Sequence, residues 1–466
     1  MLLAFFYTAM TKDWKKLLIG FGLFMFVMIL FLTGAKDVFW NAVALGGLMI
    51  YFWVFEVIPI YVTAMFPLIL AVPLGLLNKE ELAANYGDSN VFLFFGGFIL
   101  ALGLEKWNVH EQIARGIINL VGKSKTRILL GFLLSTGFLS MWISNTATAL
   151  MMLPMALAIV HAMPDSGKKS KFPVFLMLSV AYASSIGGVG TLIGSPPNTQ
   201  MASILEKNFD IKVDFFSWMS IGMPIAISML LLTFLFFYVA LGAERKEKGH
   251  DITLEKKPWT RDQIMVVLIF SGVVILWSFK ELFNSVLGFT YRDESAAILG
   301  GILLFVLPSS EKKPFLSWKD TEKLPWGILL LFGGGLALAA IMEKNGVINE
   351  LSEFFNSLGN VSFYMILLTI VVIAVFASEV LSNLAMVSIF VPLVAKFATD
   401  FGIPIEQLSI PLTLGASLAF MLPIGTPPNA IVFSSGFLHV NQMVKYGFVM
   451  NVISIILICI FSVLLL

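Results

Sequence analysis

The feature that most constrains this chain is a series of uncharged apolar runs, each about 18 to 25 residues long, that recurs along its whole length. A helix of about 20 such residues crosses the hydrocarbon core of a bilayer, because each residue adds about 1.5 Å. Of the 466 residues, 58% are hydrophobic and only 13% are charged. A soluble protein of this size needs more charged surface, and the alternating short segments of outer-membrane barrels are absent. The predicted fold class is therefore an all-α polytopic membrane protein.

About eleven of the apolar segments have the length of complete spans. They are expected at 17–34, 39–58, 60–77, 89–104, 172–205, 217–241, 262–280, 293–308, 325–342, 405–435 and 443–466. The first ten residues are apolar but too short to span, so they are expected to lie along the membrane interface. Short amphipathic helices are expected at 106–122 and 345–357.

Two further apolar segments, 128–162 and 361–398, are too long for one span of about 20 residues and too short for two spans with a loop. The first has basic residues on both sides, namely Lys123, Lys125, Arg127, Lys168, Lys169 and Lys171. The second has mainly acidic flanks, namely Glu350, Glu353, Asp400 and Glu406. Basic flanks favour the cytoplasmic side. Both segments are therefore predicted to be re-entrant helical hairpins, the first entering from the cytoplasm and the second from outside.

The distribution of positive charge agrees with this topology. With the N-terminus in the cytoplasm, 22 of the 30 Lys and Arg residues fall in cytoplasmic segments. If either hairpin were a single crossing, every later loop would change side and this excess would weaken. The net charge of +1 gives no indication of a nucleic-acid partner.

Three motifs occur twice, in the same order, at offsets of 237, 238 and 231 residues. The pairs are LFFGGFILALGLEKWNV (93–109) with LLFGGGLALAAIMEKNGV (330–347), SMWISN (140–145) with SEVLSN (378–383), and GTLIGSPPN (190–198) with MLPIGTPPN (421–429). The first copy enters the membrane from inside and the second from outside, so the chain is predicted to contain an inverted-topology repeat. Such repeats are typical of secondary transporters whose site lies near the midplane of the membrane.

The repeated motifs also predict breaks in the fifth and tenth spans. The residues expected to cause them are Gly187, Gly188, Gly190, Gly194, Pro196 and Pro197 in the first copy, and Gly415, Pro423, Gly425, Pro427 and Pro428 in the second. Non-helical backbone at membrane depth persists only inside protein or around a cavity. Freed carbonyls with Ser, Thr and Asn oxygens suit a cation such as Na⁺, whereas helix N-termini suit an anion. Because no Lys or Arg lies near the hairpin tips, coupled transport of a cation and an anion is the physical expectation.

These motifs, together with SNTAT (144–148) and FEVIPIYVTAMFP (55–67), resemble those of the divalent anion/sodium symporter family of di- and tricarboxylate transporters, over nearly the whole chain. The resemblance implies a homodimer in a bacterial inner membrane, with the N-terminus in the cytoplasm and a transport domain that moves like an elevator against a scaffold. The implied scaffold comprises 1–122 and 262–357, the transport domain comprises 123–241 and 358–466, and 242–261 is a cytoplasmic linker.

The resemblance also implies the ligands. One Na⁺ site would use Ser140, Ser144, Asn145 and Gly194, and the other would use Ser378, Asn383 and Gly425. The carboxylates of a dicarboxylate substrate would meet Asn145, Thr146, Ser195, Asn383, Thr426 and Pro427.

Two residues of the second hairpin stand out. Leu384 follows Ser382-Asn383 where the family pattern often has Thr, and it cannot donate a hydrogen bond, so the first tip is expected to grip one carboxylate more fully. Glu379 is the only charged residue in the hairpin interiors, since Lys396 lies near the end of the second segment. It is expected to be either a structural acceptor or part of cation coupling.

Three classes of function were compared. A Na⁺-coupled carrier of C4-dicarboxylates is favoured, with a citrate, tricarboxylate or sulfate carrier and a cation-independent exchanger as alternatives. An anion channel would also use broken helices, but it would carry currents without saturable exchange. An enzyme is not expected, because no nucleophile–His pair or paired intramembrane carboxylates occur at a plausible site.

Overall fold

The structure is a computed structural model that describes residues 12–122, 124–162, 170–246, 258–288, 290–356 and 362–465. Within these ranges every regular element is a helix, apart from an isolated bridge between Pro308 and Pro314. Seven of the described helices are long and apolar enough to cross a membrane. The predicted all-α polytopic class is therefore confirmed. The expected interfacial segment at residues 1–10, residues 247–257 of the linker, and the flanking Lys123, Lys168 and Lys169 lie outside the described residues.

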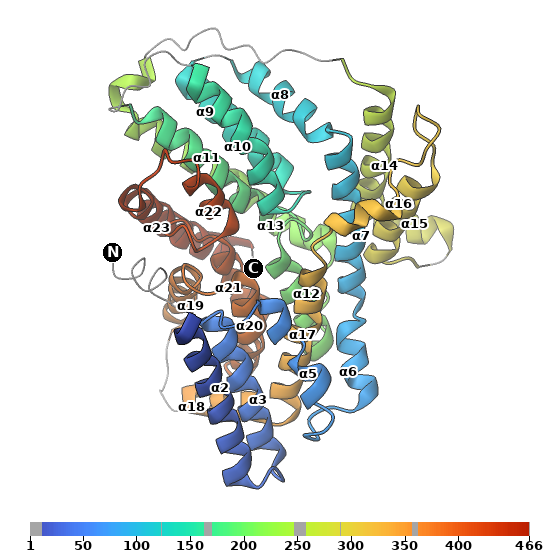
Figure 1. Ribbon diagram of the computed structural model, residues 1–466, viewed down its shortest axis with the longest axis vertical. Coiled ribbons are helices and arrows are strands. Elements are labelled where there is room, and N and C mark those ends of the chain that lie inside the picture. Colours follow the sequence, from blue (N-terminus) through green and yellow to red (C-terminus); the bar gives the residue numbers. More distant parts are fainter. Residues whose placement is uncertain are drawn as a thin grey trace.

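The first part of the chain supplies helices that begin at the lower end of the molecule in Figure 1 and continue through α7, along one side, to α8 near the upper end. They are α2 (Lys12–Thr33), α3 (Val38–Val54), α4 (Ile60–Thr63), α5 (Phe66–Leu70), α6 (Lys79–Tyr86), α7 (Ser89–Lys106) and α8 (Val109–Val121). The expected third span is wrong as a continuous helix. Pro67 lies in the first turn of α5, Pro73 follows the end of α5, and Gly75 has a φ of 72°, so this segment is divided into α4, α5 and turns.

The first predicted hairpin consists of two helices joined by a four-residue tip. The elements of this region are α9 (Lys125–Ser140), α10 (Asn145–Ala162), α11 (Phe172–Gly188), α12 (Pro196–Phe209), α13 (Phe215–Ala240) and η1 (Gly242–Lys246). Glu244 accepts hydrogen bonds from Ser170 Oγ at 2.7 Å and from Lys171 N–H at 3.0 Å. Burial raises the pKa of Glu244, but these bonds and the nearby Lys125 ammonium together hold it below its usual value. Since Lys125 begins α9 and Ser170 follows α10, both ends of the hairpin meet on one face of the protein.

The second part of the chain contains the remaining helices. They are α14 (Arg261–Ser278), α15 (Lys280–Leu287), α16 (Asp293–Val306), η2 (Trp318–Lys323), α17 (Trp326–Lys344), α18 (Val347–Asn356), α19 (Phe363–Ala377), α20 (Asn383–Asp400), α21 (Glu406–Ser417), α22 (Pro427–Phe433) and α23 (Val440–Leu465). The order from α7 to α13 is repeated from α17 to α23: a long helix, a short helix, a two-helix hairpin, a broken span and a long helix. Even the turn before the short helix is repeated, because Asn108 and Gly346 have φ values of 54° and 81°.

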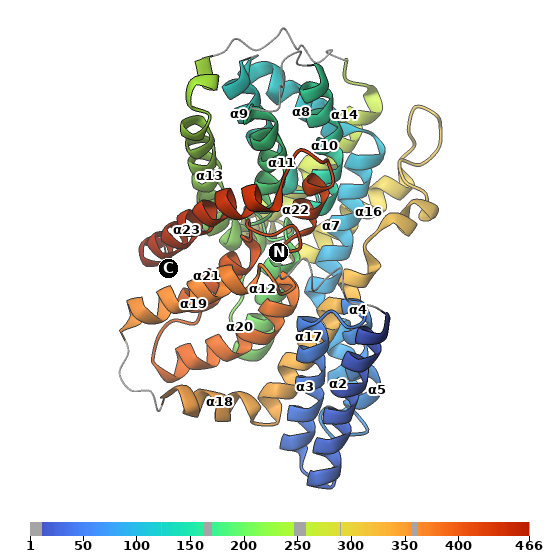
Figure 2. The ribbon, with the colours of Figure 1, turned by 60° about the vertical axis from the view of Figure 1, so that its left-hand side comes forward.

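The two halves enter the centre of the molecule from opposite directions. In Figure 2 the ends of α9 and α10 remote from their tip lie at the top, whereas those of α19 and α20 lie toward the lower left. Helices α10 and α11 pack against α22, and α12 packs against α20 and α21. The tips and breaks of the two halves are therefore brought together in the interior, as an inverted repeat requires.

Candidate functional site

The first hairpin tip and the break in the fifth span form one compact polar cluster. Ser140 Oγ donates to the carbonyl oxygen of Ser184 at 2.6 Å and lies 2.8 Å from one terminal atom of the Asn145 amide. The same amide atom lies 3.1 Å from Ser184 O and 3.2 Å from Gly194 O. The structure therefore brings together Ser140, Asn145 and Gly194, three of the four residues expected at the first Na⁺ site.

The chemistry of this cluster depends on whether the oxygen or the nitrogen of the Asn145 amide faces the two carbonyls. The two orientations have the same shape, so both fit the space. With nitrogen there, Asn145 donates to both carbonyls, and the hydrogen bonds of the cluster are satisfied without a cation. With oxygen there, four oxygens face one another, and a hard cation such as Na⁺ is the ligand that relieves their repulsion. The donor set therefore fits a weakly bound alkali cation.

Two further residues of this region change the expected set. Ser144 Oγ accepts from Ala147 N–H at 3.3 Å, so this hydroxyl is used at the start of α10 rather than toward the other three residues. Ser184 supplies an oxygen that the sequence reasoning missed. The only available signal was its position near the end of α11, where helix carbonyls begin to lose their intrahelical partners.

Two of the glycines expected to break the fifth span, Gly187 and Gly188, serve close approach instead, whereas Gly190 and Gly194 lie within the break. Gly187 and Gly188 still belong to α11, and neither they nor Gly194 has a positive φ. A Cβ on Gly187 would lie 2.1 Å from the carbonyl oxygen of Gly137 in α9. A Cβ on Gly188 would lie 2.3 Å from Asn145 Oδ1. The expectation that Gly187 and Gly188 break the helix is therefore wrong: they let the hairpin tip and the broken span touch.

The break in the tenth span is organised by Glu379. Its Oε1 accepts from Phe420 N–H at 2.8 Å and Met421 N–H at 2.9 Å, and its Oε2 accepts from Leu422 N–H at 2.9 Å. Asn451 Nδ2 donates a fourth bond to Oε1 at 2.8 Å, and Glu379 is only 4% exposed. The carboxylate thus replaces the helical acceptors that these backbone groups lose where α21 ends. Glu379 is thus a structural acceptor, and its expected part in cation coupling stays a prediction.

The second expected Na⁺ set is less tightly assembled than the first. Ser378 Oγ donates to the Val375 carbonyl at 2.9 Å within its own helix. Asn383 Oδ1 is buried and has no hydrogen-bond partner in the described part of the chain. A Cβ on Gly425 would lie 2.9 Å from Glu379 Oε2. Among these three residues, Asn383 therefore offers a free oxygen, and Gly425 lies beside a fixed negative charge.

The residues expected to meet substrate lie at the starts of helices. Ser195 and Thr426 precede α12 and α22 with extended φ values of −139° and −144°. Thr426 Oγ1 accepts from Asn429 N–H at 3.4 Å, whereas Ser195 makes no such capping bond. Thr146, in the first turn of α10, makes no side-chain hydrogen bond to any described residue. Hydroxyls of Thr146 and Ser195 are thus free to donate to an anion.

The remaining two residues of the second half differ in exposure. Pro427 begins α22 and is exposed, whereas Leu384 is only 5% exposed and belongs to the core face of α20. A hydroxyl introduced at Leu384 would therefore start from a buried position.

A buried ionic cluster joins α13 to the helices that follow it. Lys280 Nζ lies 3.0 Å from Asp214 Oδ2 and 2.9 Å from Asp293 Oδ1, and the Lys280 side chain is 7% exposed. Burial raises the pKa of Asp214, but hydrogen bonds from Ser217 N–H and Lys280 outweigh it and hold the pKa below its usual value. Burial lowers the pKa of Lys280, but Asp293 and Asp214 together raise it above its usual value.

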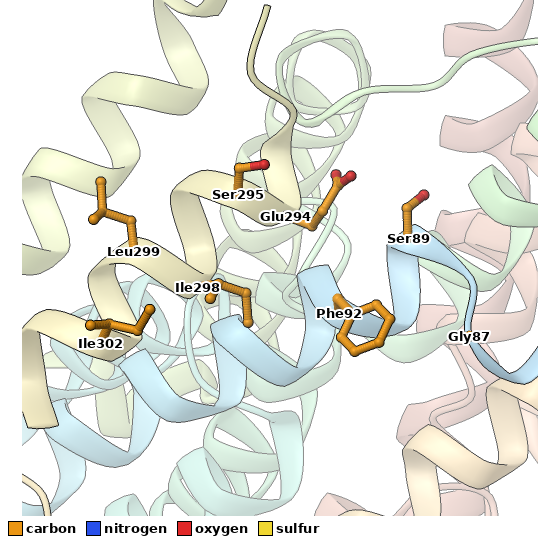
Figure 3. A pocket seen from close by; sticks show the side chains of 8 residues that line it. All are labelled: Gly87, Ser89, Phe92, Glu294, Ser295, Ile298, Leu299 and Ile302. Atoms are coloured by element: carbon orange, nitrogen blue, oxygen red, sulfur yellow. The ribbon is translucent and has the colours of Figure 1, made fainter.

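A surface groove lies away from these residues. It has a volume of about 580 Å³ between α7 and α16 and is lined by Gly87, Ser89, Phe92, Glu294, Ser295, Ile298, Leu299 and Ile302 (Figure 3). None of the expected ligand residues borders it. We locate the site at the tips and breaks instead, because the converging unpaired oxygens and hydroxyls are there.

Two re-entrant hairpins, two broken spans and an inverted repeat define the chain as a membrane transporter, and comparisons with known proteins agree. The citrate transporter family model matches residues 50–409. The sodium-dependent dicarboxylate transporter SdcS of Staphylococcus saprophyticus is 37% identical over 465 residues, which cover 95% of this chain and 89% of the relative. The protein of the same name from Staphylococcus aureus strain USA300 is 37% identical over 94% of this chain and 88% of its own.

A solved structure supports the fold alone. The YdaH transporter of Alcanivorax borkumensis, described as having an unusual topology, matches with a TM-score of 0.57 at 12% identity, over 83% of this chain and 89% of its own. The chain therefore belongs to the divalent anion/sodium symporter family, which the citrate transporter family match and the sodium-dependent dicarboxylate relatives both support.

Proposed function

We propose that this protein is a secondary active transporter that couples Na⁺ to the uptake of C4-dicarboxylates such as succinate, malate and fumarate. The observation that carries the proposal is the oxygen cluster of Ser140, Asn145, Ser184 and Gly194 beside the free Thr146 hydroxyl. A cation in this cluster would place a positive charge next to donors suited to a carboxylate. The sodium-dependent dicarboxylate transporters that are 37% identical to the chain support the same pair of ligands.

The proposed substrate site has two unequal ends. Asn145, Thr146 and Ser195 would hold one carboxylate with an amide and two hydroxyls. Asn383 and Thr426, with Pro427 beside them, would hold the other with fewer donors, because Leu384 stands where the first tip has the Thr146 hydroxyl.

The second Na⁺ site is proposed at Ser378, Asn383 and Gly425. The free Asn383 oxygen and the charge of Glu379 beside Gly425 support it. Glu379 would act on this cation through the loop that it holds, and through its charge, which no Lys or Arg of the described hairpins neutralises.

We also propose that transport uses an elevator-like motion. The moving body would comprise 123–241 and 358–466, the scaffold would comprise 1–122 and 262–357, and 242–261 would link them in the cytoplasm. The Glu244 contacts support one rigid body of hairpin, α11 and α13, because they join all three. Family resemblance supports a homodimer surrounded by lipid, in a bacterial inner membrane with the N-terminus inside.

The test is uptake of labelled succinate by proteoliposomes that contain the purified protein, with an inward Na⁺ gradient or with K⁺ in its place. We expect saturable uptake that requires Na⁺ and that unlabelled malate and fumarate inhibit more strongly than citrate or sulfate. Stronger inhibition by citrate would favour a tricarboxylate carrier, as the citrate transporter family match allows. Equal uptake in Na⁺ and K⁺ would favour a cation-independent exchanger.

A further inference from the structure

Two asparagines that end the Gly-[Ser/Thr]-Pro-Pro-Asn motifs make the same contacts in both halves. Asn198 Nδ2 donates to the carbonyl oxygens of Gly188 and Thr191, each at 2.9 Å. Asn429 Nδ2 donates to the carbonyl oxygens of Ala419 at 3.2 Å and Leu422 at 3.0 Å. All three pairs of equivalent positions are separated by 231 residues, and both asparagines are 0% exposed. Such duplication is a property of the repeat rather than of one packing accident.

Each asparagine fixes the shape of its break. Its amide sits in the first turn of the second half-helix and uses both protons on carbonyls that lie ten and seven residues earlier. In the first half, one carbonyl belongs to the last residue of α11 and the other lies within the break. The amide therefore holds the end of one half-helix, the loop and the start of the next in a single arrangement.

The residues held in this way touch the proposed cation sites. The Gly188 backbone packs against Asn145, and a Cβ on Gly194 would lie 2.7 Å from Gly188 O. In the second half, Leu422 N–H donates to Glu379 at 2.9 Å, and Gly425 N–H donates to Leu422 O at 3.1 Å. Loss of either asparagine would therefore free a residue one contact away from the proposed Na⁺ ligands.

We infer that Asn198 and Asn429 are positioning residues, each holding one break in the shape that its own cation half-site requires. This inference rests on the proposed Na⁺-coupled function. It assigns the two asparagines no contact with Na⁺ or substrate. Because each acts within its own half, their effects on Na⁺ binding should be independent.

A matched control is available in Asn41. Its Nδ2 also donates to two loop carbonyls, Ala35 O at 3.2 Å and Leu74 O at 3.1 Å, and it is only 1% exposed. It lies in α3, away from both breaks. Asn41→Ala therefore removes the same bonds and a similar burial, so a purely structural effect should appear in it as well.

The experiment compares Asn198→Ala, Asn429→Ala and Asn41→Ala with the unaltered protein. Two quantities are measured: the rise in melting temperature that Na⁺ causes in detergent, and the Na⁺ activation of succinate uptake in proteoliposomes. For the first two variants we expect the Na⁺ concentration for half-maximal effect to rise about fivefold or more in both assays. The apparent affinity for succinate at saturating Na⁺ should remain within about twofold, because substrate donors are untouched. Asn41→Ala should lower the melting temperature without changing either Na⁺ response.

The outcomes separate the inference from the function on which it rests. If the first two variants lose stability as Asn41→Ala does, and keep the Na⁺ response of the unaltered protein, they are structural and the inference is overturned. If an alanine variant does not fold, Asn198→Ser and Asn429→Ser keep one donor and are held to the same criterion. If Na⁺ affects neither stability nor uptake of the unaltered protein, the proposed function fails, and the inference fails with it.

Discussion

Replacing Glu379 by Gln tests how the second break is held. If the Gln side chain takes the place of the Glu379 side chain, its oxygen at the position of Oε1 would keep the bonds from Phe420 N–H, Met421 N–H and Asn451 Nδ2. Its amide nitrogen at the position of Oε2 would face Leu422 N–H, so that bond would be replaced by two opposed donors. The change therefore weakens three hydrogen bonds and removes a fourth.

The magnitude follows from the strength of each bond. A hydrogen bond to a charged group contributes about 1.5 to 3 kcal/mol and a neutral one about 0.5 to 1.5 kcal/mol. Three weakened bonds and one lost bond give a loss of about 4 kcal/mol at the lower end of these ranges, which we take because bonds to one carboxylate are not additive. We expect the melting temperature in detergent to fall by several degrees. The Na⁺ activation of succinate uptake should weaken as well, since the loop leads to Gly425.

Glu81→Gln is the control, because Glu81 pairs with Lys344 at 2.6 Å on the exposed surface. Loss of such a pair should leave the melting temperature and the Na⁺ activation nearly unchanged. An unchanged melting temperature and Na⁺ affinity for Glu379→Gln would refute the reasoning. A weakened Na⁺ response at full stability would mean that the carboxylate acts directly on the cation, not through the loop.

Three further predictions concern the tips and the ionic cluster. Thr146→Ala should weaken succinate affinity about tenfold or more, since it removes a donor to a charged group. Leu384→Ala should lower stability but leave succinate affinity nearly intact, because the side chain is buried. Equal losses of affinity for the two variants in competition assays would show that the two tips are used symmetrically. Leu384→Thr should not tighten succinate binding, because the residue is 5% exposed in the core, and a clear gain in competition assays would show that its hydroxyl reaches the cavity. Lys280→Met should cost about 3 kcal/mol, measured by thermal unfolding against Lys344→Met as an exposed control, because it leaves the buried Asp293 and the half-buried Asp214 without their cation. The lowered pKa of Asp214 means that its contribution to stability is present at neutral pH and is lost as the pH falls through that pKa. The melting temperature of Lys280→Met should therefore depend less on pH in the acid range than that of the unaltered protein. An unchanged pH dependence in this variant would contradict the prediction.

The helical hairpins could be predicted from the sequence because their signals are local. Segment length and flanking charge are read directly from the chain, and the structure brings Lys125 and Ser170 to one face as the basic flanks indicate. The paired motifs likewise predicted both broken spans. The continuous third span was wrong because hydropathy does not register the effect of Pro67 and Pro73 on helix length.

The details of the candidate site needed the structure because they depend on contacts between distant segments. Ser184 carries no motif, and its carbonyl joins the cluster only because α11 packs against α9. Gly187 and Gly188 were expected to break the fifth span, but they admit the backbone of α9 and the side chain of Asn145, and the break begins after them. The tenth span is broken with the help of Glu379, 41 to 43 residues away along the chain, which no local pattern reveals.

Coupling between Na⁺ and succinate is the central claim, and the most direct measurement is the flux of labelled Na⁺ into proteoliposomes. External succinate should stimulate Na⁺ influx, and Na⁺ should stimulate succinate influx over the same range of concentrations. Both stimulations should be lost together in Asn145→Ala. This variant removes the amide that joins Ser140, Ser184 and Gly194. Succinate influx that proceeds without Na⁺ influx, or coupled fluxes that survive in folded Asn145→Ala, would contradict the account.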